Sequence, residues 1–77
     1  MPISAPANWT PTPGSSNVAA FAYDPEARLL HVRFNSGHQY AYQDVPPEIH
    51  DGLVNADSAG SYIHENVKGS YDYARTS

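Results

Sequence analysis

The sequence predicts an α+β domain in which a three-stranded antiparallel meander is followed by two short helices packed on one face. Three segments between residues 17 and 45 carry alternating apolar residues and are separated by short turn sequences. Two adjacent prolines then end this pattern, and the apolar spacing changes to that of helices. Strands that precede helices along the chain are typical of two-layer α+β domains.

The first hairpin is predicted from residues 17–23 and 28–34. Asp24 begins the turn between them, a position that aspartate favours, and the second strand alternates cleanly between apolar and polar residues. If a four-residue loop closes this hairpin, Phe21 faces Leu30 and joins the core side of the sheet.

The third strand is predicted over residues 38–45, and the turn before it, residues 35–37, decides where Tyr40 and Tyr42 point. A two-residue turn would pair Arg33 with Tyr40, so that both tyrosines face outward beside a cation. A three-residue turn with a left-handed glycine would shift the pairing and send both tyrosines into the core. The sequence Asn-Ser-Gly suits the longer turn, so burial is the favoured interpretation.

The first helix is predicted over residues 47–56. Proline is well placed in the first turn of a helix, and Asp44 is the expected capping acceptor. Gly52 inside this helix indicates close packing against a neighbour. A second short helix is predicted within residues 57–69, because Ser58 is a good N-cap and Gly69 a typical stop.

The chain is divided into a flexible, proline-rich N-terminal arm over residues 1–15 and a single domain over residues 16–77. Four of the seven prolines lie within the first thirteen residues. Trp9, the one large apolar side chain of the arm, either packs locally on the domain or anchors into a neighbouring subunit. Three short strands leave a small core and open edges, so we expect a homo-oligomer, most simply a dimer, with Trp9 at its interface.

The charge of the chain limits its partners. Eight acidic residues and four Lys and Arg residues give a formal net charge of −4. Affinity for duplex nucleic acid requires many cations on phosphates, whereas the four present here are scattered along the sequence. We therefore expect no duplex DNA partner, although one or two cations suffice for a small phosphorylated ligand.

The compartment is inferred from what the sequence lacks. There is no cysteine, no basic and apolar leader of the secretory type, and no apolar stretch long enough to cross a membrane. We expect a cytoplasmic protein with no membrane partner.

The order and spacing of several short motifs resemble the KTSC domain, a family named for its occurrence at the C-terminus of some lysyl-tRNA synthetases. The motifs are Ser36-Gly37, Tyr40-x-Tyr42, Val45-Pro46, Ser58-x-Gly60, Tyr62 and Tyr71-x-Tyr73, and the resemblance covers about residues 15–74. The chain departs from the family pattern at His64, where we expect asparagine, and in having few basic residues beside the last aromatic pair. The resemblance implies RNA binding only through the association with a synthetase.

Catalysis and metal binding find no support in the sequence. The four histidines include no pair at the i, i+4 spacing of a metal-binding helix, and we interpret them as unrelated surface residues. No nucleophile motif or glycine-rich phosphate loop occurs. We expect no enzyme activity, no catalytic residue, no metal and no cofactor.

Two classes of function remain. The first is a non-catalytic binding module for single-stranded RNA or a nucleotide, including a small nucleotide signal sequestered between subunits, with aromatic rings that stack on bases. Its candidate ligand-binding residues are Arg33, Tyr40, Tyr42, Lys68, Tyr71 and Tyr73. The alternative is a protein-interaction module that uses the sheet edge and exposed aromatics. Added salt should weaken nucleic-acid binding steeply and an apolar interface hardly at all.

Overall fold

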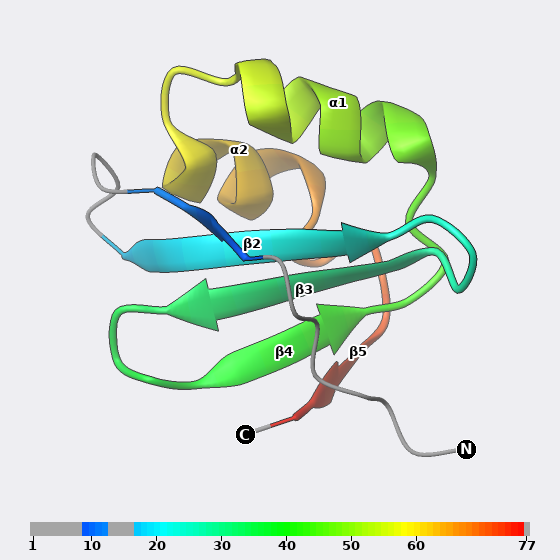
Figure 1. The fold of residues 1–77 in the computed structure, drawn as a ribbon, viewed down its shortest axis with the longest axis horizontal. Helices are drawn as coiled ribbons and strands as arrows, with labels where there is room; N and C mark the ends of the chain where they lie inside the picture. Colours follow the sequence, from blue (N-terminus) through cyan, green and yellow to red (C-terminus); the bar gives the residue numbers. More distant parts are fainter. Residues whose placement is uncertain (1–8, 13–16, 77) are drawn as a thin grey trace.

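The structure, a computed structural model, describes residues 9–12 and 17–76. It is an α+β fold in which two helices cover one face of a five-stranded antiparallel sheet with the strand order β1-β2-β3-β4-β5 (Figure 1). The elements are β1 (Thr10–Pro11), β2 (Val18–Asp24), β3 (Leu29–Phe34), β4 (Gln39–Tyr42), α1 (Pro47–Asn55), α2 (Ala59–Asn66) and β5 (Tyr73–Arg75). The predicted class is therefore confirmed.

The predicted three-stranded meander is the centre of this wider sheet. β1 adds to the free edge of β2, and β5 adds to β4 with Tyr42 opposite Tyr73. Strands of two and three residues carry too little alternation to be found by periodicity, which is why both were missed. Residues 1–8 and 13–16, most of the predicted arm, lie outside the described residues, so the division into arm and domain stays a prediction.

The two hairpin turns set the register of the sheet. In the first, Asp24 Oδ1 accepts from the backbone N–H groups of Glu26 and Ala27, at 3.1 and 3.3 Å, and a four-residue turn follows. Phe21 lies on the core face as predicted, but its direct partner is Val32, and Leu30 pairs with Tyr23.

In the second turn, Gly37 has a φ of 95° and its N–H donates to the carbonyl of Phe34 at 2.9 Å. Val32 then pairs with Tyr40 and Leu30 with Tyr42, so the predicted three-residue turn is confirmed.

The core lies between the helices and the sheet face that they cover, which we call the inner face. Leu30 and Val32 are fully buried there, and Tyr42 is 3% exposed. The helices contribute Leu53 from α1 and Ile63 from α2. Because the core depends on alternate residues of β3 and β4 pointing to one side, a one-residue slip would expose it.

The helix ends follow the sequence in part. Ser58 caps α2, since its Oγ accepts from the N–H of Ser61 at 3.4 Å. The expected cap of α1 is wrong: Asp44 precedes the N-cap Pro46 by two residues and instead faces Arg28 at 3.7 Å. Gly52 packs as predicted, because a Cβ there would lie 2.7 Å from Tyr62 Cζ and closer still to the hydroxyl oxygen.

Candidate functional site

An aromatic cleft opens on the inner face. Its first part, which we call the aromatic lobe, has a volume of about 250 Å³ and is lined by Phe34, Tyr40, Tyr42, Lys68 and Tyr73. The register brings these rings together, since Tyr40 and Tyr42 alternate on β4 and Tyr73 pairs beside Tyr42. Four of the six predicted ligand-binding residues therefore meet in one place.

The rings of the aromatic lobe meet edge to face rather than in a parallel stack. Tyr40 and Tyr73 have centroids 5.3 Å apart at 89°, and Phe34 and Tyr40 lie 5.5 Å apart at 72°. Tyr42 and Tyr73 are 5.6 Å apart and tilted by 49°. Tyr73 is 60% exposed, so its ring forms the solvent side of the lobe. Such a concave set of ring faces and edges suits a planar apolar group.

Burial also disfavours ionisation of the deepest ring. It raises the pKa of Tyr42 above its usual value, and the neighbouring Tyr73 and Tyr40 act in the same direction. A tyrosine is already neutral at pH 7, and this shift extends to higher pH the range in which Tyr42 adds no negative charge to the lobe.

A second part of the cleft, the polar lobe, adjoins the first and has a volume of about 350 Å³. Its lining is Asn17, Phe34, Asn35, Ser36, His38, Tyr40 and Lys68. Phe34, Tyr40 and Lys68 line both lobes. Among the described residues that line either lobe, none is acidic, although the chain as a whole is acidic. The cleft is thus suited to an anion.

One cationic side chain, that of Lys68, lines this cleft, and a second, that of Arg75, contacts the lining residue His38. Lys68 follows Val67, the C-cap of α2, and its backbone N–H donates to the carbonyl of Ile63 at 2.7 Å, which holds the residue at the helix end. Arg75 of β5 lies with its guanidinium 2.8 Å from His38 Nδ1. Sequence reasoning missed Arg75, His38 and Phe34. The one sequence feature that could have indicated Arg75 is its position two residues after Tyr73, because residues two apart on a strand point to the same face.

Arg33 lies on the opposite side of the sheet, which we call the outer face, and the structure does not bring it to the cleft. Its guanidinium carbon is 4.4 Å from the centre of the Trp9 ring, a cation–π arrangement. The three-residue turn is the reason, because it pairs Arg33 with Gln39 instead of Tyr40.

The outer face also holds a buried histidine. His31 is 4% exposed, with Ala22 and Ala41 as its cross-strand partners and the Trp9 ring 6.3 Å from its own. The interpretation of all four histidines as surface residues is therefore wrong for His31, which sits at the centre of the sheet. Burial lowers the pKa of this imidazole, outweighing the opposite effect of Asp24. Trp9 contacts its own sheet, and its predicted place at a subunit interface stays a prediction.

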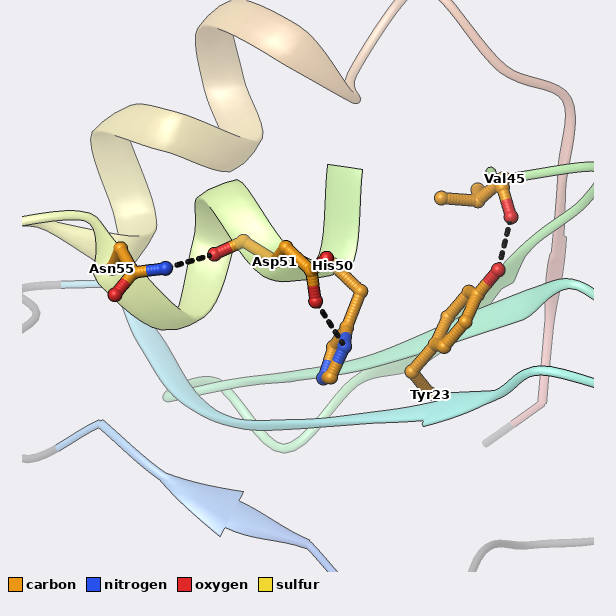
Figure 2. A network of polar contacts seen from close by, with 5 residues as sticks. All are labelled: Tyr23, Val45, His50, Asp51 and Asn55. Carbon is orange, nitrogen blue, oxygen red and sulfur yellow. Dashed lines mark hydrogen bonds and ion pairs between the residues drawn. The ribbon is translucent and has the colours of Figure 1, made fainter. Parts of the chain in front are cut away.

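Tyr71 lines a separate surface hollow with Tyr73, formed by residues 69–73. A polar network around α1, drawn in Figure 2, includes none of the residues that line the cleft. There His50 stacks on Tyr23 at 4.9 Å, and the Tyr23 hydroxyl donates to the carbonyl of Val45. These contacts tie the helix layer to the sheet and include none of the predicted ligand-binding residues.

Within residues 9–12 and 17–76, no group of three or more His, Asp or Glu side chains is arranged to hold a metal ion. No described helix is both long and apolar enough to span a bilayer.

Comparison with protein families shows that residues 14–71 match the model of the KTSC domain. The chain belongs to the KTSC domain family. A crystal structure of a KTSC domain protein from Yersinia pestis is similar, with a TM-score of 0.85, 27% identity, and coverage of 91% of this chain and 97% of that one.

Relatives of this KTSC domain occur alone and within a larger enzyme. Proteins of Stutzerimonas stutzeri and Tsukamurella paurometabola are each 43% identical over 54 residues, which is 70% of this chain and 76% and 81% of theirs. A lysine–tRNA ligase of a Nostoc species is 37% identical over 65 residues, which is 84% of this chain but 12% of the ligase.

The motifs by which the sequence resembles a KTSC domain have structural positions in this fold. Gly37 supplies the left-handed residue of the second turn, Ser58 caps α2, and Tyr62 packs on Gly52. Tyr40 and Tyr42 pack in or against the core, yet both also line the aromatic lobe. In this chain, Tyr40 and Tyr42 therefore contribute both to the packing of the fold and to the lining of the cleft.

Proposed function

We propose that this KTSC domain is a non-catalytic binding module that holds single-stranded RNA or a nucleotide in the two-lobed cleft. The supporting observation is the convergence of Phe34, Tyr40, Tyr42 and Tyr73 with Lys68 in one concave site. Stacking of a base on protein aromatics contributes about 1–3 kcal/mol per base, and a lysine beside the rings suits the phosphate. The relationship to a region of lysine–tRNA ligases is consistent with an RNA or nucleotide partner.

The proposal includes capture of a small nucleotide between subunits. Tyr73 and Arg75 belong to β5, the edge strand of the described sheet, so the solvent side of the aromatic lobe lies at the margin of the molecule. A second copy at this edge would cover the exposed ring of Tyr73 and enclose the ligand.

One observation favours a different function, a protein-interaction module. Tyr73 is 60% exposed on an edge strand, and edge strands with exposed aromatics are surfaces on which another chain can add a strand. The two functions differ in their response to salt, since phosphate contacts weaken steeply with added salt and apolar contacts do not.

A thermal-shift panel of nucleotides, cyclic nucleotides and short single-stranded RNAs tests the proposal. A ligand at about 100 times its dissociation constant stabilises the folded state by roughly 2.7 kcal/mol, which raises the Tm of a small domain by several degrees. Tyr73→Ala should abolish the shift with little loss of stability, because the ring is mostly exposed. Val54→Ala, a truncation of a comparably exposed side chain on α1, is the matched control. The absence of a shift with every member of the panel would favour the protein-interaction function.

A further inference from the structure

The two lobes of the cleft differ in chemistry, since aromatic rings dominate one lining and polar side chains the other. That difference narrows the class of ligand that the cleft would bind. We infer that the ligand is a single small nucleotide with a terminal phosphate, its base in the aromatic lobe and its phosphate in the polar lobe. The inference rests on the proposed function and goes beyond it, because it excludes an RNA strand as the main ligand and assigns a new anion site to the turn between β3 and β4.

The polar lobe has the groups that a phosphate needs. Lys68 supplies a full positive charge, and Ser36, Asn35 and Asn17 bring side chains that can donate hydrogen bonds. Charge-assisted hydrogen bonds to phosphate are about twice as strong as neutral ones, and none of the described lining residues is an acid that would repel the anion. Because Lys68 lines both lobes, it lies where the base and the phosphate of one nucleotide would meet.

Arg75 gives His38 the tautomer that an anion requires. An arginine guanidinium has donors only, so at 2.8 Å the Nδ1 of His38 must accept from it. The single ring proton of the neutral imidazole then resides on Nε2. His38, which lines the polar lobe, therefore carries its one ring N–H on the nitrogen that does not face Arg75. We take that N–H as the donor to the phosphate, and Arg75 as a positioning residue that acts through His38.

The remaining described cations, Arg28 and Arg33, do not line either lobe. Arg28 faces Asp44 at 3.7 Å beside the other hairpin turn, and Arg33 lies over Trp9 on the outer face. Strand-binding proteins instead combine stacked aromatics with a continuous cationic groove. The lobes, of about 250 and 350 Å³, also lie near the lower end of the usual range for small-molecule sites, roughly 300–1,000 Å³. Charge and size both favour one nucleotide.

Isothermal titration calorimetry on the intact chain tests this inference with four probes: nucleoside monophosphates, the matching nucleosides, inorganic phosphate, and RNA hexamers with a 5′-hydroxyl end. We expect a monophosphate to bind at least about tenfold more tightly than its nucleoside, as one good charge-assisted contact implies. Lys68→Gln and His38→Ala should each remove most of that difference. Arg28→Gln removes the same charge at the far end of the sheet and should leave it unchanged.

The positioning role of Arg75 has its own readout. Nitrogen NMR shifts of the His38 ring should show a protonated Nε2 in the wild type and a mixture of tautomers in Arg75→Gln. A tautomer mixture in the wild type would overturn the role assigned to Arg75.

The outcomes separate this inference from the proposed function. Hexamers that bind while monophosphates do not would overturn the inference and leave RNA binding standing. Inorganic phosphate that binds as tightly as a monophosphate would overturn it too, because the aromatic lobe would then contribute nothing. If no probe binds at all, the proposed function fails with it.

Discussion

A single buried imidazole makes the stability of this small domain depend on pH. His31 is enclosed by alanines of the neighbouring strands and by Trp9, and burial lowers the pKa of its ring. In the unfolded chain a histidine titrates near pH 6.5. Below about that pH the unfolded chain binds a proton that the folded chain does not, so the free energy of unfolding falls as the pH falls. The loss ends once the pH is below the pKa of the folded state.

His31→Phe should therefore flatten the pH dependence of stability. Phenylalanine keeps a ring beside Trp9 but cannot bind a proton. Urea denaturation between pH 8 and pH 5 should show wild-type stability falling further than that of the variant, with the difference growing below about pH 6.5. The exposed Val54 provides the control, since Val54→Ala changes no titratable group and should leave the shape of the profile unchanged. Parallel profiles for wild type and His31→Phe would contradict this account.

At the scale of elements, the second hairpin shows what a sequence can predict. The tripeptide before β4 predicts a bulged turn, and that turn alone settles which face Tyr40 and Tyr42 occupy. The same register places Arg33 on the opposite face of the sheet from Tyr40 and Tyr42. The turn that buries the tyrosines therefore also rules out Arg33 as the cation beside them. Lys68 was found from the sequence because it adjoins the last aromatic pair.

The rest of the site depends on long-range pairing that local patterns do not carry. β5 is three residues long, and its pairing with β4 brings Arg75 to His38 across 37 positions of the sequence. Phe34 lies on the same side of its strand as Leu30 and Val32, so the alternation predicts that it belongs to the core. In the structure its ring is half-buried and also lines both lobes. Whether the last residue of an apolar stripe is covered depends on where the helices end, which the strand pattern does not specify.

The contact between the two helices allows a sharp test of Gly52. Alanine favours a helix over glycine by about 1 kcal/mol, but its Cβ would displace the half-buried ring of Tyr62. We expect Gly52→Ala to destabilise the domain by roughly 1–3 kcal/mol in chemical denaturation, since overpacking outweighs propensity.

The matched background is Tyr62→Ala, in which the obstructing ring is absent. There Gly52→Ala should be neutral or stabilising by up to about 1 kcal/mol. The same destabilisation in both backgrounds would show that Tyr62 is not the cause.

For the whole molecule, the two edge strands of the described sheet have backbone groups that are available to pair with another chain. A chain of 77 residues buries only about 60% of its unfolded surface, and β5 presents an edge strand with an exposed tyrosine. Association of two copies is the simplest way to bury more surface. We therefore expect a homodimer.

Gel filtration with light scattering at micromolar concentration measures this directly. The wild type should elute at twice the chain mass of 8.4 kDa. If Trp9 anchors into a neighbour, Trp9→Ala should shift the equilibrium towards monomer, while Val54→Ala should not. A strict monomer for the wild type would exclude the dimer, and an unchanged Trp9→Ala dimer would exclude Trp9 as its anchor.

The two faces of the sheet also carry different optical reporters. The only tryptophan of the chain lies against Arg33 and His31 on the outer face, whereas the cleft is built from tyrosines on the inner face. Indole emission thus reports on the packing of Trp9 against the outer face and on the ionisation of His31. The sheet separates the indole ring from the cleft. A titration that changes tyrosine signals and leaves the indole spectrum unchanged would locate its ligand on the helix side without a single substitution.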